Sequence, residues 1–95
     1  MSLARVTVIR SDGTEETHDV QRTILCKWVE RVIDCDLFDV VNLRDGRVML
    51  VDDLGHDRGK PRNEKATALY HSICKPGTTH FIAGDVVVAL DEDFG

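Results

Sequence analysis

The stretch from Gly55 to Leu90 constrains the fold more than any other part of the sequence. A charged loop is followed by apolar residues that recur at helical spacing: Ala66, Leu69, Tyr70 and Ile73. They predict a helix that begins at Asn63 and ends at Lys75-Pro76-Gly77. The almost wholly apolar run from Asp85 to Leu90 predicts a buried strand. We therefore expect the helix to pack against this strand, with a polar loop at the N-terminus of the helix.

The N-terminal third predicts a hairpin followed by a helix. Residues 5–10 alternate between apolar and polar side chains, as in a half-buried strand, and Asp12-Gly13 marks a turn. Residues 15–20 predict a returning strand that is short or lies at an edge of the sheet, because few of them are apolar. A wide apolar stripe over residues 24–33 predicts a helix with Thr23 or Asp19 as its N-cap and Trp28 in the core.

A second hairpin is predicted between Leu37 and Val51. Two runs rich in β-branched residues flank Asp45-Gly46, a pair that is typical of two-residue hairpin turns. Such a turn places Leu43 opposite Val48.

The predicted elements follow the order β-β-α-β-β-α-β. Because hairpins dominate, we expect an α+β fold with a mainly antiparallel sheet of five to six strands and two helices on one face. A sequence of 95 residues is long enough for one hydrophobic core, so we expect a single domain over residues 1–95.

The composition narrows the class of partner. The net charge of −5 argues against a general nucleic-acid binder, which needs a basic face. No apolar run is long enough to span a membrane, and no secretory leader precedes the first strand, so we expect a cytoplasmic protein. We expect a monomer, or a homodimer formed through an edge strand at residues 15–20.

The loop before Asn63 is the main candidate site. Helix N-termini carry unpaired N–H groups and attract anions, and five residues cluster around this one: Arg58, Lys60, Arg62, Asn63 and Lys65. They predict a site for an anion or an acidic partner. The alternative is a set of solvated charges, neutralised in part by Asp57 and Glu64. The spacing of Gly55, Gly59 and Lys60 does not fit a phosphate-binding P-loop.

A second candidate site combines His71, Cys74 and His80. Positions i and i+3 place His71 beside Cys74 on a helix, which permits a zinc site or a Cys–His nucleophile. Neither set is complete, so we predict no metal, no cofactor and no catalytic residue.

Two groups of acidic residues complete the candidates. Asp52, Asp53 and Asp57 are interpreted as a charged turn, and the others as a surface that could face a basic partner: Asp34, Asp36, Asp39 and the tail at 91–93.

Several short motifs resemble a family of small proteins of unknown function that are encoded by phages, plasmids and other mobile elements. The motifs are a hairpin with a glycine turn, a Pro-x-Asn helix start at Pro61, and an Ile-x-Gly strand at Ile82. The resemblance extends from about Val20 to Leu90. It implies a mobile-element setting and carries no established activity.

These observations support two hypotheses about function. The first is a non-catalytic binding or accessory protein that acts on a protein partner, such as a host protein. The second is a small enzyme or a domain that binds an anion or nucleotide through the loop 55–63, with His71 and Cys74 nearby.

Overall fold

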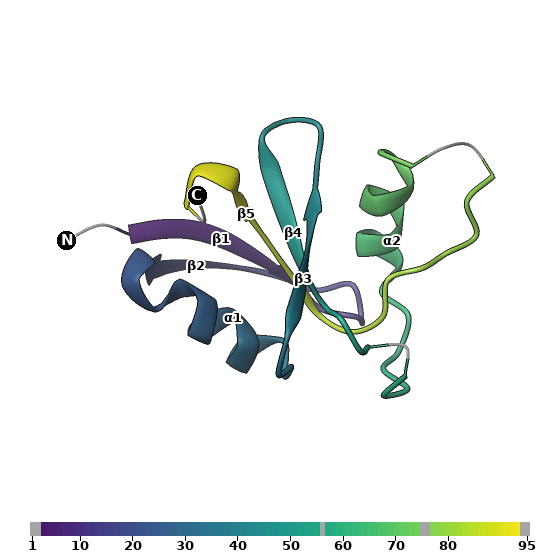
Figure 1. Ribbon diagram of the computed structural model, residues 1–95, viewed down its shortest axis with the longest axis horizontal. Helices are drawn as coiled ribbons and strands as arrows, with labels where there is room; N and C mark the ends of the chain where they lie inside the picture. The colour runs from purple at the N-terminus through teal and green to yellow at the C-terminus, as the bar shows by residue number, and fades with distance from the viewer. Residues whose placement is uncertain (1–2, 56, 75–76, 94–95) are drawn as a thin grey trace.

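The most apolar strand lies at the centre of the sheet. A computed structural model, which describes residues 3–55, 57–74 and 77–93, contains five strands in the order β2-β1-β5-β4-β3, and all neighbours are antiparallel (Figure 1). Its elements are β1 (Leu3–Ile9), β2 (Glu15–Gln21), α1 (Leu25–Val32), β3 (Phe38–Asn42), β4 (Arg47–Asp52), α2 (Glu64–His71) and β5 (Val86–Leu90). Short 3-10 turns lie at Arg22–Ile24 and Asp91–Asp93. The α+β class, the five antiparallel strands and the element order are as predicted.

The two helices cover opposite faces of the sheet, which corrects the prediction that both lie on one face. Val87 and Ala89 of β5 pack in the core under α1, whereas Val86 and Val88 pack in a second core with Ala66 of α2. Successive side chains of a strand point to opposite faces, so a fully apolar strand needs cover on both. In Figure 1, α1 lies beside β1 and β2, and α2 lies beyond the β3–β4 hairpin.

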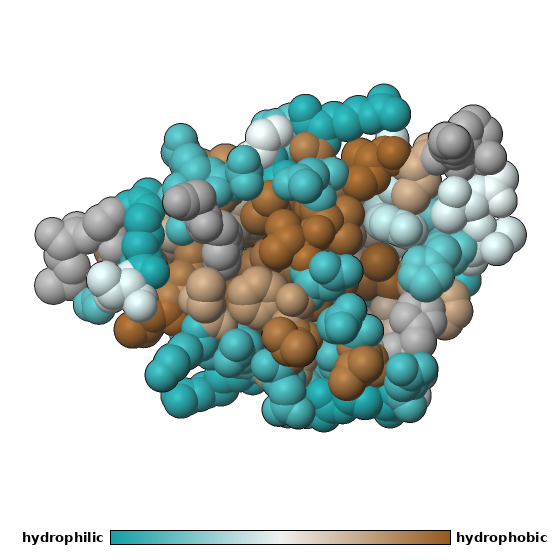
Figure 2. Space-filling view, viewed as in Figure 1, coloured by the Kyte–Doolittle hydropathy of each residue, from teal (hydrophilic) through white to brown (hydrophobic). Residues whose placement is uncertain are grey.

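The α2 face is only partly covered. A groove of about 460 Å³ remains between α2 and the strands, and its lining includes Thr7, Leu69 and Val88. Figure 2 shows apolar side chains exposed in the middle of the molecule, with hydrophilic side chains along its lower margin. Among the described helices, none has the length and apolar character needed to cross a bilayer.

The β3–β4 hairpin forms where predicted, but its register differs by one residue. The N–H of Leu43 donates to the carbonyl of Arg47 at 2.9 Å, and Asn42 lies opposite Val48. The loop therefore has three residues, and Gly46 adopts φ 82° at its end. This geometry fits a turn closed by a left-handed glycine, a form that an Asp-Gly pair permits equally well.

The helix boundaries differ from those predicted. α1 begins after Ile24, which offers no side-chain cap, so neither Thr23 nor Asp19 caps it; Trp28 is half-buried rather than in the core. α2 ends at His71, before the predicted stop at Lys75-Pro76, which lies outside the described residues. β2 is at an edge, as predicted, and extends over seven residues.

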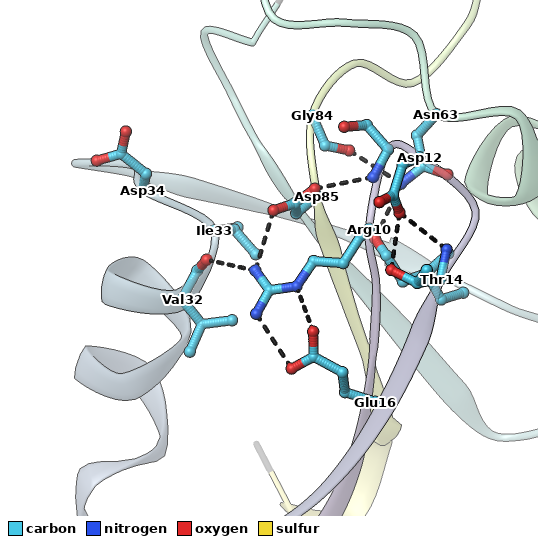
Figure 3. Close-up of polar contacts among 12 residues, drawn as sticks. Arg10, Asp12, Thr14, Glu16, Val32, Ile33, Asp34, Asn63, Gly84 and Asp85 are labelled. Atoms are coloured by element: carbon cyan, nitrogen blue, oxygen red, sulfur yellow. Dashed lines mark hydrogen bonds and ion pairs between the residues drawn. The ribbon is translucent and has the colours of Figure 1, made fainter.

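Arg10 joins four segments at the end of β1 (Figure 3). Its guanidinium binds both carboxylate oxygens of Glu16, at 2.8 and 3.2 Å, and the carboxylate of Asp85 at 3.0 Å. It also donates to the carbonyl of Val32 at the end of α1, at 3.3 Å. These contacts connect β1 and β2 with α1 and the segment before β5.

We expect acid to destabilise the fold in part through Glu16. Its contacts with Arg10 and His18 lower the pKa of Glu16 from 4.5 to about 2. Because the folded-state pKa is the lower one, this contribution to stability is complete above the unfolded-state pKa and disappears as the pH falls towards 2. Thermal unfolding measured from about pH 6 to about pH 2 should show a steeper loss of Tm for the native protein than for Glu16→Gln. Glu92→Gln, a change at an exposed carboxylate, should follow the native curve, and a Glu16→Gln curve parallel to the native one would contradict the prediction.

Candidate functional site

Asn63, where the helix was predicted to begin, is the N-cap of α2, and it is completely buried. Its Oδ1 accepts a hydrogen bond from the N–H of Ala66 at 3.0 Å. Its Nδ2 donates to the carbonyls of Ile9 and Gly84, at 2.9 and 3.0 Å. Both polar atoms of the side chain thus connect α2 to the end of β1 and to the segment before β5, so the side chain stabilises the fold.

Lys60 and Arg58 hold the C-terminal end of α1 and the residues that follow it. The Nζ of Lys60 donates to the carbonyls of Ile33 and Asp34, at 2.8 and 2.7 Å, and lies 2.6 Å from the buried carboxylate of Asp52. Arg58 approaches the same carboxylate at 3.4 Å and the Asp34 carbonyl at 3.0 Å. Burial by itself raises the pKa of Asp52, but the hydrogen bond from Lys60, a backbone N–H and both cations hold it below its usual value.

The remaining predicted anion ligands also have partners in the same chain. Arg62 lies 2.8 Å from the carboxylate of Glu64, and its guanidinium carbon is 5.3 Å from the centre of the Phe81 ring. Lys65 lies 2.9 Å from the carboxylate of Glu15 in β2. The four cations are directed at carboxylates on β4, α2 and β2, so anion binding at this helix end stays a prediction.

The second candidate group gathers around Tyr70. The Nε2–H of His71 donates to the carbonyl oxygen of His80 at 2.6 Å, and the ring of His80 meets that of Tyr70 edge-on, with centres 5.8 Å apart. A hydrogen bond with Cys74, together with burial, raises the pKa of Tyr70. The Cys74 thiol therefore meets a phenol, whereas a Cys–His nucleophile needs a thiolate beside an imidazole.

The described residues offer no ready metal site. No three His, Cys, Asp or Glu side chains within residues 3–55, 57–74 and 77–93 lie where they could hold a metal ion together. Cys35, which a zinc site could use as a fourth ligand, is buried on the α1 side of the sheet, where burial raises the pKa of its thiol. The other possible fourth ligand, His56, lies outside the described residues.

A cleft of about 280 Å³ lies where the base of the β3–β4 hairpin meets the segment 80–83. Apolar groups form much of its lining: Val41, Val51, Tyr70, Ile82 and Ala83. Carboxylates and one imidazole supply the rest: Asp39, Asp52, Asp53, Asp57 and His80. The backbone comes very close at Gly55, where an added Cβ would lie 2.9 Å from the carbonyl oxygen of Ala83. Glycine at this position therefore lets the loop after β4 pack against the segment 80–83.

The carboxylates of the cleft differ in their partners. Asp52 is neutralised by Lys60 and Arg58. Asp39 accepts a hydrogen bond from the N–H of Val40 at 3.0 Å. Within the described parts of the chain, no cation forms an ion pair with Asp39, Asp53 or Asp57, and all three residues are exposed. The cleft therefore combines an apolar floor with three negative charges that the described residues leave uncompensated.

Sequence reasoning found the components of this cleft but not the cleft itself. It placed Asp39 in a group that could face a basic partner, and it interpreted Asp53 and Asp57 as a charged turn. The signal that was available is a run of aspartates around two apolar strands. The approach of Tyr70, His80 and Ile82 to those strands depends on long-range packing, which no short pattern reveals.

The fold and the cleft define the class: a small α+β protein whose antiparallel sheet carries one helix on each face and an acidic cleft at one edge. The sequence matches no family model, no curated protein and no solved structure. The resemblance to a mobile-element family therefore depends on the quoted motifs alone.

Proposed function

We propose that this is a small non-catalytic binding protein whose cleft receives a basic, partly apolar segment of another protein. The observation that carries the proposal is the composition of the cleft, an apolar floor beneath the exposed carboxylates of Asp39, Asp53 and Asp57. Lysine and arginine side chains can pack their apolar stems on such a floor and bring their charge to the carboxylates. The attraction is stronger in a partly desolvated cleft than on an open surface.

Two further observations support a basic protein partner. The net charge of −5 favours encounter with positively charged surfaces over acidic ones. The cations that the sequence offered to an anionic ligand are already paired with carboxylates of the chain, as described above. In keeping with the mobile-element setting that the resemblance implies, we propose a host protein as the source of the segment.

Loss of charge at the cleft should weaken binding of a basic peptide. The probe is a fluorescent decapeptide of alternating lysine and valine, and its control alternates glutamate and valine. We expect the Asp53→Asn/Asp57→Asn variant to bind the lysine peptide about tenfold more weakly than the native protein, a difference of about 1.4 kcal/mol, in fluorescence anisotropy. The expected cause is the loss of two charges that face the peptide cations.

The matched control removes the same two charges elsewhere. Asp91→Asn/Glu92→Gln lies in the C-terminal turn, where both residues are exposed, and should leave the affinity within about twofold of the native value at moderate salt. Equal weakening in both double variants would mean that only net charge matters. Equal affinity of the native protein for the lysine and glutamate peptides would overturn the proposal.

A further inference from the structure

We infer that the basic segment binds as an extended strand added to the outer edge of β3, so that the sheet gains a sixth strand. The inference rests on the proposed function, because it describes how the same partner reaches the same cleft. β3 is the edge strand on that side of the sheet, and Asp39 and Val41 of β3 line the cleft. The strand edge and the cleft are therefore one continuous surface.

The hydrogen-bonding pattern of the hairpin shows which backbone groups face outwards. The carbonyl of Leu37 accepts from the N–H of Asp53 at 3.2 Å, and the N–H of Leu43 donates to the carbonyl of Arg47 at 2.9 Å. Because alternate residues of an antiparallel strand bond to the same neighbour, the odd-numbered residues of β3 face β4. The N–H and C=O groups of the even-numbered residues therefore point away from the sheet.

Val40 and Asn42 are two of the residues that carry these outward groups. The N–H of Val40 is held by the side chain of Asp39 at 3.0 Å, which confirms that it does not bond to β4. An incoming strand can replace this local contact with the carbonyl of its own backbone. Main-chain hydrogen bonds of this kind supply affinity in strand addition, and alternate side chains supply specificity.

Apolar residues accompany this edge. Leu37 is 67% exposed, Val40 is 45% exposed and Leu54 is 48% exposed, which makes them three of the six exposed large hydrophobic residues of the described chain. They lie at or next to β3 and the end of β4. An added strand would therefore bury apolar surface as well as backbone groups.

Charge decides what can occupy this edge. Three carboxylates lie along or beside it, at Asp36, Asp39 and Asp53, and no described cation forms an ion pair with them. A second copy of the chain would bring the same three charges into contact with them, which is unfavourable, whereas a basic strand compensates them.

The opposite edge of the sheet has a different character. The carboxylates of β2 are each paired within the chain: Glu15 with Lys65, Glu16 with Arg10 and Asp19 with Arg5. The edge at β2 thus has no comparable negative charge to attract a basic segment. The groove beside α2 is likewise bordered by the Glu15–Lys65 pair, so charge does not favour a basic segment there.

N-methylation of the peptide tests strand addition. The probes are the lysine–valine decapeptide, the same peptide N-methylated on every valine, and the same peptide N-methylated on every lysine. In an antiparallel addition with lysines towards the cleft, the residues that bond to β3 carry their side chains on the opposite face, so they are the valines. We expect methylation of the valines to weaken binding at least about tenfold and methylation of the lysines to change it by less than about threefold.

Hydrogen exchange supplies the second measurement. In the saturated complex, the amides of Val40 and Asn42 should exchange at least about tenfold more slowly than in the free protein. If only the lysine-methylated peptide binds more weakly, and the amides of Val40 and Asn42 are still protected, strand addition is also supported, but in a parallel orientation. Equal binding of both methylated peptides without protection at Val40 and Asn42 would overturn strand addition and leave the proposed function intact. Failure of the unmodified peptide to bind would overturn both.

Discussion

Replacement of Asn63 by alanine is expected to lower the free energy of unfolding by about 4 kcal/mol. Removal of an N-cap costs about 1 kcal/mol, and each buried carbonyl left without a donor costs about 1–3 kcal/mol. The carbonyls in question are those of Ile9 and Gly84, and the amide of Ala66 loses its acceptor. Because small domains have about 5–15 kcal/mol of stability, this one change should remove a large share of it. Urea unfolding followed by circular dichroism measures the difference.

Two further variants separate the roles of the Asn63 side chain. Asn63→Asp keeps an oxygen for the cap but places a carboxylate against two carbonyls, so it should be no more stable than Asn63→Ala. Glu64→Ala, an exposed change in the same helical turn, should stay within about 0.5 kcal/mol of the native value. If Asn63→Ala loses less than about 1 kcal/mol, the buried hydrogen bonds do not hold the strands and α2 together in the way described.

Replacement of Lys60 by methionine is expected to lower the free energy of unfolding by about 3 kcal/mol, in the range for breaking a buried ion pair. The carboxylate of Asp52 is 2% exposed and keeps the N–H of Leu54 at 3.0 Å, but its one remaining cation among the described residues is the more distant Arg58 at 3.4 Å. The carbonyls of Ile33 and Asp34 lose their shared donor at the end of α1. Denaturant unfolding of this variant at several pH values should also show that the pKa of Asp52 in the folded state is higher than in the native protein, because Lys60 lowers it there.

An exposed ion pair supplies the matched control for this substitution. Lys65→Met removes the partner of Glu15, but both side chains are about half exposed, so the loss should be below about 1 kcal/mol. The double variant Lys60→Met/Asp52→Asn should recover part of the loss, because no buried charge remains uncompensated. Equal losses for Lys60→Met and Lys65→Met would contradict the assigned role of Lys60.

Local patterns predicted the elements well where side chains within a few residues decide the structure. The N–H of Thr14 donates to the carboxylate of Asp12 at 2.9 Å, and this turn produces the first hairpin as expected. The second helix begins next to Asn63, and the strand at 86–90 is largely buried, both in agreement with the sequence. Capping, turn formation and apolar periodicity are short-range effects, so a short window of sequence contains their causes.

The register of the β3–β4 hairpin was predicted wrongly because the local signal permits two answers. Asp45-Gly46 fits a two-residue loop, and it also fits a three-residue loop in which Gly46 closes the turn with positive φ. The strand residues do not distinguish these, because Val48, Met49, Leu50 and Val51 are buried whichever face they meet. When both faces are covered, hydrophobicity no longer specifies register.

The sequence of β5 by itself indicates that the helices lie on opposite faces of the sheet. A strand that is apolar at every position needs cover on both faces, and β5 is such a strand. The prediction of two helices on one face treated β5 as one half of a pair with α2. In the structure, α1 packs against one face of β5 and α2 packs against the other face.

The sequence was sufficient to locate the strands, helices and turns along the chain, because these depend on neighbouring residues. The partners of the charged groups depended on contacts between distant segments: Lys60 meets Asp52 and the end of α1, and Lys65 meets Glu15. A cation is available to bind an anionic ligand only when no carboxylate of the chain already neutralises it. Which carboxylates lie near a given cation depends on the folded structure. For the same reason the acidic cleft could emerge only from the folded chain, where packing of the segment 80–83 against β3 and β4 brings an apolar floor beneath uncompensated carboxylates.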